Sequence, residues 1–331
     1  MNSASPPGAG SSAAPTLSVV VSTYNRAGLL AGALHSLCMQ TLDPADYEVV
    51  IVDNNCTDHT HAVASHYCAT YPNVRYCSEQ EQGLSHARNR GWREASGRFV
   101  GYFDDDAKAP SHWLETALSL IRRQRPDIFG GPYYSFYSST RPAWFRHRYG
   151  SSDRGTRARL LRDDEFLYGT NIFFRRELLA RLGGFDPALG MSGDRMGYGE
   201  ETAMLITARQ QAPDLRVYYD PHLYVFHLVA PQKLHLRWLA RQQFVGGRYA
   251  YRVFGRKVLR NTLGEKVRLT RSLFRLGREF GRDLTLGSLR RDRNAYPYAQ
   301  NYLYEQTVPR LYRLGEVYEE FVATLRQNGN A

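Results

Sequence analysis

Three adjacent carboxylates, Asp104-Asp105-Asp106, directly follow the apolar run at residues 99–103. Neighbouring carboxylates repel one another, and a bound cation relieves that repulsion. Their oxygens are hard ligands that suit Mg²⁺ or Mn²⁺, and a substrate diphosphate would help to coordinate the ion. The alternative is an ordinary polar turn rich in aspartate. The triplet therefore indicates a candidate divalent-metal site at the end of a strand.

Other polar residues suit a nucleotide. Residues 22–26, Ser-Thr-Tyr-Asn-Arg, offer hydroxyl groups, an aromatic face and a cation. Asp53 ends a second apolar run and can accept hydrogen bonds from a base or a ribose. Arg88 lies near the expected start of a helix, and a planar, permanently charged guanidinium suits phosphate. Structural alternatives stay open, with Thr23 or Asn25 as helix caps and Asp53 as a cap or turn residue.

The elements that would position these residues alternate between strand and helix. Short runs rich in β-branched and aromatic residues suit strands buried on both faces of a parallel sheet. They lie at residues 17–22, 47–52, 74–77 and 98–103, with helices expected at 27–40, 57–71 and 85–95. This order predicts an α/β fold with a mostly parallel, Rossmann-like sheet flanked by helices. In such a sheet, ligands bind at the carboxyl ends of the strands.

The pattern loosens after Pro110. A helix is expected at residues 113–124, an extended run at 127–137 and a long loop at 138–159; further strands are expected at 171–174, 215–219 and 223–227. The composition changes near Pro231. We therefore expect a disordered leader at 1–16, a catalytic domain at 17–230 and a basic, mainly helical C-terminal region at 231–331.

The positive charge of the chain is concentrated in this last region. Residues 232–295 hold 17 Lys/Arg against 4 Asp/Glu, so this segment carries +13 and the rest carries −2 of the total +11. The run is amphipathic in places, and Gly255, Gly264 and Gly277 are expected to break it into short helices. Basic amphipathic helices commonly bind anionic membrane surfaces. The alternative is a helical cap with solvated arginines.

Composition places the chain among globular cytoplasmic proteins. The hydrophobic fraction is 43%, and no stretch approaches the ~20 apolar residues of a spanning helix. Residues 1–15 lack the basic and apolar parts of a secretory signal. The four cysteines show no zinc or CxxC spacing, which favours free thiols in a reducing compartment. We expect a cytoplasmic protein that can lie peripherally at the inner face of the cell membrane.

The motifs form an ordered set. Ser-Thr-Tyr-Asn-Arg, Val-Asp-Asn-Asn-x-Thr-Asp, Gly-Leu-Ser-x-Ala-Arg-Asn-x-Gly and Phe-Asp-Asp-Asp occur in that order. This set resembles inverting glycosyltransferases of family 2, and the similarity continues through residues 169–176, 183–186 and 199–201. It covers about residues 17–230. The resemblance implies the GT-A fold, a nucleotide-sugar donor, Mn²⁺ or Mg²⁺, and inversion at the anomeric carbon.

The resemblance also implies roles for single residues. The nucleotide-sugar set is Thr23, Tyr24, Asn25, Arg26, Asp53, Arg88, Asp104, Asp105, Gly169 and Asn171, the last two where the family builds its sugar and acceptor pocket. Asp104 and Asp106 match the outer acids of the Asp-x-Asp motif, with Asp106 as the direct metal ligand. His227 matches a histidine near the donor phosphates or metal. Alternatively it is a structural residue at the end of an apolar run.

The catalytic pair departs from the family pattern. The family usually has Glu-Asp where this chain has Glu200-Glu201, and the second acid is the usual base. Glu201 is therefore expected to take the proton of the acceptor hydroxyl, and Glu200 is the possible substitute. Acidic pairs at helix starts also occur for dipole reasons alone.

The expected function is transfer of a sugar, from a UDP-sugar first of all, to a hydroxyl of a glycan or lipid-linked acceptor in surface polysaccharide or glycoconjugate synthesis. One alternative is nucleic-acid binding through the Arg-rich region, suggested by a pI near 9.5. Another is a nucleotidyltransferase of similar fold. That class usually opens with a Gly-rich loop after its first strand, and residues 22–26 contain no glycine.

Overall fold

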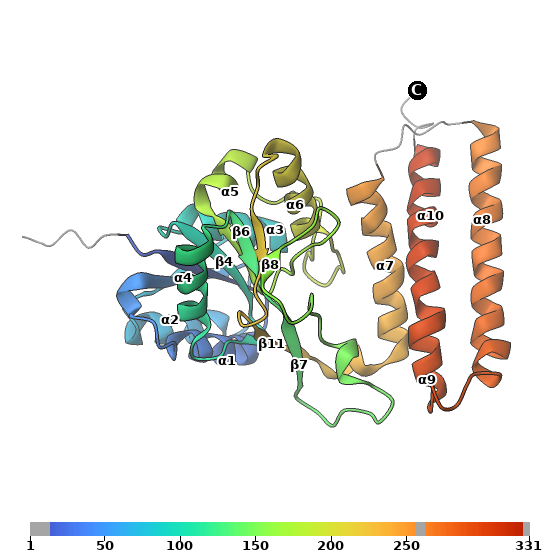
Figure 1. Cartoon of the computed structure of the whole chain (residues 1–331), viewed down its shortest axis with the longest axis horizontal. Coiled ribbons are helices and arrows are strands. Elements are labelled where there is room, and N and C mark those ends of the chain that lie inside the picture. Colours follow the sequence, from blue (N-terminus) through green and yellow to red (C-terminus); the bar gives the residue numbers. More distant parts are fainter. Residues whose placement is uncertain (1–13, 256–261, 327–331) are drawn as a thin grey trace, which may run out of the picture.

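The computed structural model describes residues 14–255 and 262–326, so most of the predicted leader lies outside the described residues. From Thr16 on, the backbone is tied to the sheet. The Thr16 N–H donates to the carbonyl of Asp46, and its carbonyl accepts from the N–H of Phe99, both at 3.0 Å. The chain forms a layered α/β part and a layer of long helices beside it (Figure 1).

An eight-stranded sheet forms the centre of the α/β part, in the order β3-β2-β1-β4-β9-β6-β10-β8. Its strands are β1 (Leu17–Thr23), β2 (Tyr47–Asp53), β3 (Val74–Ser78), β4 (Phe99–Asp104), β6 (Ile128–Gly130), β8 (Arg159–Leu160), β9 (Ile172–Arg175) and β10 (Val217–Tyr219). β1 to β4 are parallel, as are β6 and β10, whereas β9 lies antiparallel between β4 and β6 and β8 pairs antiparallel with β10. Every residue of β2 is buried, as expected for an apolar strand covered on both faces.

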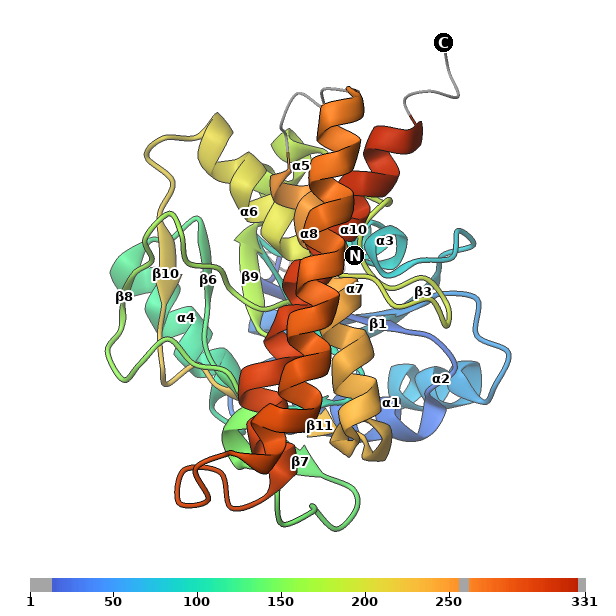
Figure 2. The same ribbon diagram turned by 90° about the vertical axis from the view of Figure 1, so that its right-hand side faces the viewer.

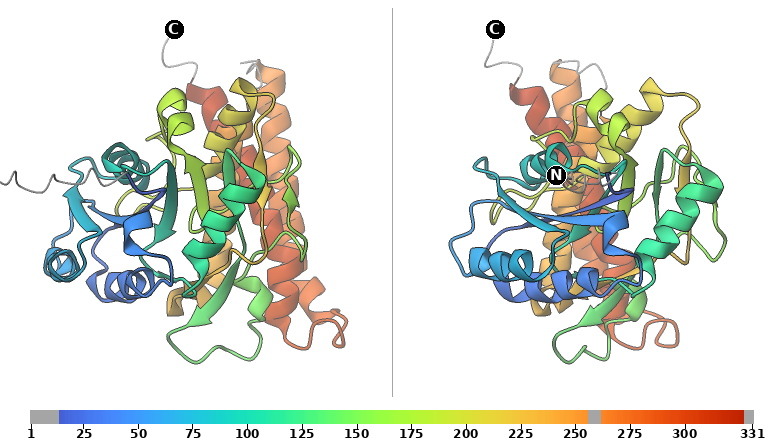
Figure 3. Two further views of the ribbon diagram at one scale, coloured as in Figure 1. Left: turned by 60° about the vertical axis from the view of Figure 1, so that its left-hand side comes forward. Right: turned by 90° about the vertical axis from the view of Figure 1, so that its left-hand side faces the viewer.

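Helices cover both faces of this sheet (Figure 3). They are α1 (Ala27–Cys38), α2 (Thr60–Thr70), α3 (Leu84–Glu94), α4 (Trp113–Gln124), α5 (Arg176–Leu182) and α6 (Glu200–Gln211), with 3₁₀ turns at Pro44–Asp46, His147–Tyr149 and Pro231–Leu234. α1, α2 and α4 contribute to the core on one face, and α3, α5 and α6 to the core on the other. The predicted fold class, a mostly parallel sheet flanked by helices with a helical C-terminal region, is confirmed.

A second, three-stranded sheet lies beside the carboxyl end of β4, in the order β5-β11-β7. Its strands are β5 (Ala107–Lys108), β7 (Tyr133–Tyr137) and β11 (Val225–Val229). β11 pairs antiparallel with β5, which places His227 opposite Ala107, the residue after the acidic triplet. The N–H of Leu228 also donates to the carbonyl of Asp106 at 3.0 Å. This sheet therefore brings His227 to the triplet across more than a hundred residues of sequence.

Three long helices form the C-terminal layer: α7 (Leu236–Phe254), α8 (Leu263–Arg282) and α10 (Val308–Arg326). α10 lies between α7, which faces the α/β part, and α8, which is outermost (Figures 1 and 2). The connection contains α9 (Ala299–Tyr302) and π-helical turns at Asp283–Gly287 and Leu303–Thr307. α7 ends before Gly255, as predicted. α8 continues through Gly277, and the helix break predicted at Gly277 is therefore wrong. In the described part of the chain, no helix combines the length and apolar character needed to cross a bilayer.

Candidate active site

The acidic triplet lies at the carboxyl end of β4, and its side chains point in two directions. Asp104 is the last residue of β4, and Asp105 and Asp106 form the turn to β5. The Asp105 carboxylate turns inward and accepts hydrogen bonds from Thr23 Oγ1 at 2.8 Å and Arg26 Nη1 at 3.1 Å. Burial raises the pKa of Asp105 to about 6, although the charge of Arg26 opposes that shift. Asp105 therefore anchors the turn.

Asp104 and Asp106 turn towards His227. His227 Nε2 lies 3.5 Å from Asp104 Oδ2 and 3.1 Å from Asp106 Oδ1. Burial alone would raise the pKa of both carboxyls, but the hydrogen bonds from His227 together with the positive charges around them, Arg88 beside Asp104 and Lys233 beside Asp106, lower both. Burial opposes the charged imidazole as well, yet its bonds to the two carboxylates raise the pKa of His227 to about 9. At neutral pH the cluster therefore consists of two carboxylates and an imidazolium.

This cluster has the composition of a divalent-metal site. One ligand atom from each of Asp104, Asp106 and His227 can be chosen so that all three lie within 4.8 Å of one another. Carboxylate oxygens suit Mg²⁺ and Mn²⁺, and an imidazole nitrogen is a further ligand for Mn²⁺. The residues thus fit the predicted cation, and His227 would bind it in its neutral form.

Two further positively charged side chains, Arg26 and Lys233, lie near Asp106. Lys233 does not belong to the site residues predicted from the sequence. Arg26 Nη1 lies 3.3 Å and Lys233 Nζ 4.0 Å from Asp106 Oδ2. Lys233 belongs to the 3₁₀ turn that follows β11. The sequence offers no local signal for this contact, because it depends on the pairing of β11 with β5. Lys233 adds positive charge at the edge where a diphosphate would lie.

The predicted catalytic pair lies in the first turn of α6, across Arg88 from the triplet. The Arg88 guanidinium lies 2.8 Å from Glu200 Oε1 and 3.6 Å from Asp104 Oδ1. Glu201 Oε1 lies 4.0 Å from the same guanidinium and accepts a hydrogen bond from the backbone N–H of Gly169 at 3.0 Å. The Glu200 side chain is 5% exposed and that of Glu201 21%. Of the two acids, Glu201 is the one that a substrate can reach.

Arg88 keeps a permanent positive charge at the centre of the site. Burial alone would lower its pKa, but the carboxylates of Glu200, Glu201 and Asp104 hold it above the ordinary value. Burial, with the charge of Glu201 beside it, raises the pKa of Glu200. A side chain at position 169 would collide with the Arg88 guanidinium and the Glu201 carboxylate. Gly169 therefore allows these groups to meet.

Asn25 and Asp53, both predicted for the nucleotide, bond locally: Asn25 lies just after β1, and Asp53 is the last residue of β2. Asn25 has φ 51°, and its Oδ1 accepts from the N–H of Thr57 at 2.7 Å, so it joins two loops and does not cap α1. Asp53 accepts from the N–H of Cys56 at 2.8 Å and from the Tyr76 hydroxyl at 3.0 Å. Their contacts with a nucleotide stay predictions.

The end of β1 and the loop after it hold three more residues of the predicted set. Thr23 and Arg26 bond to Asp105, so the structure brings both to the acidic turn. Tyr24 lies between them in sequence and is half-buried. The end of β1 and this loop therefore border the acidic triplet.

Asn171, predicted for the sugar and acceptor pocket, is fully buried at the start of β9. Its amide nitrogen donates to the carbonyls of Pro132 and Leu223 at 3.1 and 2.6 Å, and its oxygen accepts from the Trp113 indole at 3.1 Å. These bonds join β9 to the segments that enter β7 and β11. A direct contact of Asn171 with a sugar stays a prediction.

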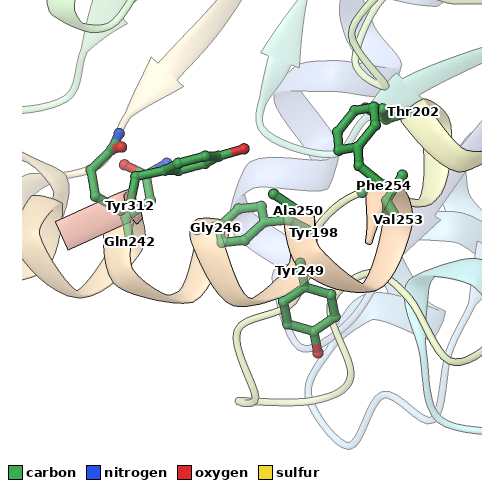
Figure 4. Close-up of a pocket in the computed structure, with 11 residues that line it drawn as sticks. Tyr198, Thr202, Gln242, Gly246, Tyr249, Ala250, Val253, Phe254 and Tyr312 are labelled. Atoms are coloured by element: carbon green, nitrogen blue, oxygen red, sulfur yellow. The ribbon is translucent and has the colours of Figure 1, made fainter. Parts of the chain in front are cut away.

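A pocket of about 250 Å³ opens beside the first turn of α6, towards α7 and α10. Tyr198, Gly199 and Thr202 line it together with Tyr249 and Phe254 of α7, and Figure 4 shows Thr202 next to Phe254. Gly199 and Thr202 flank the acid pair in sequence, so the pocket lies next to the site. None of its lining residues belongs to the set predicted from the sequence.

These positions define a class. An acidic turn after a parallel strand, opposite an accessible acid, is the arrangement of a glycosyltransferase with the GT-A fold. The particular family follows from the sequence: residues 18–183 match the model of glycosyl transferase family 2, and the chain belongs to that family. The predicted recognition of a nucleotide-sugar-dependent family is thereby confirmed. The match also favours a sugar transferase over the nucleotidyltransferase alternative.

Individual relatives agree with this assignment. The chain is similar to the glucosyl-dolichyl phosphate glucuronosyltransferase of Haloferax volcanii, with 28% identity over 245 residues, 72% of this chain and 76% of that protein. Its fold is similar to the mannosyltransferase PcManGT of Pyrobaculum calidifontis, solved with GDP-Man and Mn²⁺, at a TM-score of 0.56 and 18% identity over 96% of this chain and 76% of the other. It is also similar to residues 1–349 of S. aureus TarS, solved with UDP-GlcNAc, at a TM-score of 0.55 and 19% identity over 95% and 92%.

Proposed function

We propose that this protein is a metal-dependent, inverting glycosyltransferase that moves a sugar from a nucleotide-diphosphate donor, a UDP-sugar first of all, to a hydroxyl of a glycan or lipid-linked acceptor. One observation carries the proposal: Arg88 lies within 4.0 Å of Glu201 on one side and 3.6 Å of Asp104 on the other. The proposed base and the proposed metal ligands thus lie on either side of one guanidinium. The product would enter surface polysaccharide or another glycoconjugate.

The donor half of the site would hold the diphosphate. Asp104, Asp106 and His227 would bind Mn²⁺ or Mg²⁺, which when bound stabilises negative charge on the departing diphosphate. Lys233 and Arg26 add fixed positive charge beside Asp106. Asp105, held by Thr23, keeps the turn in place.

The acceptor half depends on Glu201. Its carboxylate would remove the proton of the acceptor hydroxyl as that oxygen attacks the anomeric carbon. The Gly169 N–H orients the carboxylate, and Arg88 is held beside it by Glu200. One displacement assisted by a base, with no covalent intermediate, inverts the anomeric configuration. Glu200 is the second candidate for the base.

The cellular setting is also a proposal. We place the protein in the cytoplasm, peripheral to the inner face of the membrane, where a lipid-linked acceptor would be presented. This placement is supported by the name of a relative, the glucosyl-dolichyl phosphate glucuronosyltransferase, which refers to a lipid-linked sugar.

Binding of a nucleotide panel tests the donor half. We would measure thermal stabilisation by UDP, GDP, dTDP, CDP and ADP, with and without Mn²⁺, on the wild type and on Asp106→Ala. A ligand that binds only the native state raises its stability by mass action. We expect one diphosphate to stabilise the wild type in the presence of metal and to lose this effect in Asp106→Ala. No stabilisation by any diphosphate at millimolar concentration would overturn the proposed donor site.

A stereochemical measurement tests the acceptor half. Once a donor is known, the anomeric configuration of the product is compared with that of the donor by NMR. We expect inversion. Retention would exclude a single displacement assisted by Glu201.

A further inference from the structure

The outermost helix leaves large apolar side chains in solvent. Among the described residues, the three most exposed large apolar side chains are Leu263, Phe274 and Leu289, at 78, 77 and 75%. Leu263 and Phe274 share one face of α8 with Val267, because residues four and seven apart lie on the same side of a helix. Leu269 lies on the opposite side and is fully buried. α8 thus packs one apolar face inward and exposes a second one.

Arginines border this exposed apolar face. Arg271 is four residues after Val267, and Arg278 is four residues after Phe274, so both lie beside the apolar stripe. Val267, Arg271 and Arg275 help to line a groove of about 450 Å³ on α8. Within the described residues, Arg271, Arg275 and Arg278 form no ion pair, unlike other arginines of this layer.

The same surface continues past the end of α8. Leu284 and Leu286, in the π-helical turn, are 46 and 49% exposed, and Leu289 follows them. Arg290 and Arg293 are exposed at this end. The patch is therefore an elongated strip of apolar side chains bordered by positive charge.

We propose that this strip, the outward face of α8 and residues 284–289, docks on an anionic lipid bilayer. Leu and Phe side chains of an amphipathic helix enter the headgroup boundary, and neighbouring arginines bind lipid phosphates. Charge complementarity selects this occupant. A second copy of the chain would bring two rows of unpaired arginines together, and like charges in contact are unfavourable.

The position of α8 suits anchoring. Figure 2 shows α8 in front of α7 and α10, on the side of the molecule away from the catalytic sheet. α10 and α7 lie between α8 and the α/β part, so a bilayer on this face would leave the site uncovered (Figure 1). The inference goes beyond the proposed transfer reaction, and it assigns a contact surface to the membrane setting proposed above, on which it rests. It predicts that membrane binding and activity on a water-soluble acceptor are separable.

Vesicle cosedimentation tests the proposal. The full-length protein is mixed with phosphatidylcholine vesicles or with vesicles containing about one third phosphatidylglycerol, at roughly 0.15 M salt. We expect binding to the anionic vesicles at least about tenfold stronger than to the neutral ones. Arg271→Glu/Arg275→Glu should weaken binding by about tenfold or more, and Leu263→Ser/Phe274→Ser by a similar factor.

Matched variants on another surface provide the control. Arg122→Glu/Arg123→Glu makes the same charge change on exposed positions of α4, and Met39→Ser removes a side chain that is 54% exposed. Both should bind vesicles within about twofold of the wild type. Equal binding to both vesicle types, or an equal loss in the α4 and α8 charge variants, would overturn the proposal. So would light scattering that shows a dimer dissociated by Phe274→Ser without vesicle binding.

Discussion

Glu201 is the residue on which the proposed chemistry depends most directly. Replacement by glutamine retains an oxygen that can accept the hydrogen bond from the Gly169 N–H, but it removes the base. We expect kcat for Glu201→Gln to fall by roughly 10²–10⁴-fold, the usual contribution of a general base. Affinity for the nucleotide diphosphate should stay within about twofold, since Glu201 does not belong to the metal cluster. Steady-state kinetics and calorimetric binding measure the two quantities.

Glu200→Gln is the matched comparison. Glu200 is buried and accepts a hydrogen bond from Arg88 at 2.8 Å, which a glutamine oxygen can also accept. We therefore expect a loss in kcat below about tenfold. A larger loss for Glu200→Gln than for Glu201→Gln would assign the base to Glu200.

His227 leads to a prediction about pH. The imidazolium lies between Asp104 and Asp106 with a pKa raised to about 9, and a metal can bind only the neutral ring. Below that pKa, apparent Mn²⁺ affinity should fall roughly tenfold for each pH unit, and binding at neutral pH should release about one proton. Calorimetric titrations in two buffers of different ionisation enthalpy count that proton. His227→Asn should release none, and an affinity independent of pH in the wild type would contradict the assignment.

At the scale of elements, close contact between α7 and α10 depends on glycine. A Cβ at Gly247 would overlap the carbonyl oxygen of Tyr312, and one at Gly315 that of Phe244. We expect Gly247→Ala to lower the free energy of unfolding by about 1–3 kcal/mol, because the helices must shift apart. At Gly277 a Cβ meets nothing within 4 Å, so Gly277→Ala should raise stability by up to about 1 kcal/mol. Urea denaturation measures both, and equal effects would contradict the close contact.

The elements of the α/β part are predictable because their signals are local. Apolar runs predict strands at residues 17–22 and 47–52, and the structure has Leu17–Thr23 and Tyr47–Asp53. The helix expected at 113–124 is α4 with the same bounds. α8 runs through Gly277 because a glycine costs a helix only about 1 kcal/mol, which packing against α10 can offset. That packing is invisible in the local sequence.

The same distinction between local signals and tertiary packing applies to the candidate site. Motif order is enough to predict that the acids and Arg88 lie at one edge of the sheet. It does not predict that Asp105 turns inward to Thr23, since that depends on side-chain packing. Lys233 reaches Asp106 only because β11 pairs with β5, a nonlocal pairing that no periodicity reports.

At the scale of the whole molecule, the α/β part and the helical layer pack against each other, although the composition of the chain changes near Pro231. Trp144 and Phe145, in the long loop of the α/β part, share a core with Leu239 of α7. Arg146 and Arg148 from the same loop lie 3.0 and 2.6 Å from Glu305 in the helical layer. The segment predicted as a loop at residues 138–159 therefore joins the two parts.

This shared core predicts how the molecule unfolds. Asn301 is 1% exposed and donates hydrogen bonds from the helical layer to the Trp144 carbonyl and the Tyr149 hydroxyl. Asn301→Ala removes the donor to the buried Trp144 carbonyl, which costs about 1–3 kcal/mol, whereas the Tyr149 hydroxyl keeps its bond to Glu305. Because the two parts share one core, we expect a single calorimetric transition that moves as a whole to lower temperature. Gln300→Ala, at the exposed neighbouring position, should change stability by less than about 0.5 kcal/mol. Two separate transitions, with Asn301→Ala moving only one, would show that the parts unfold independently.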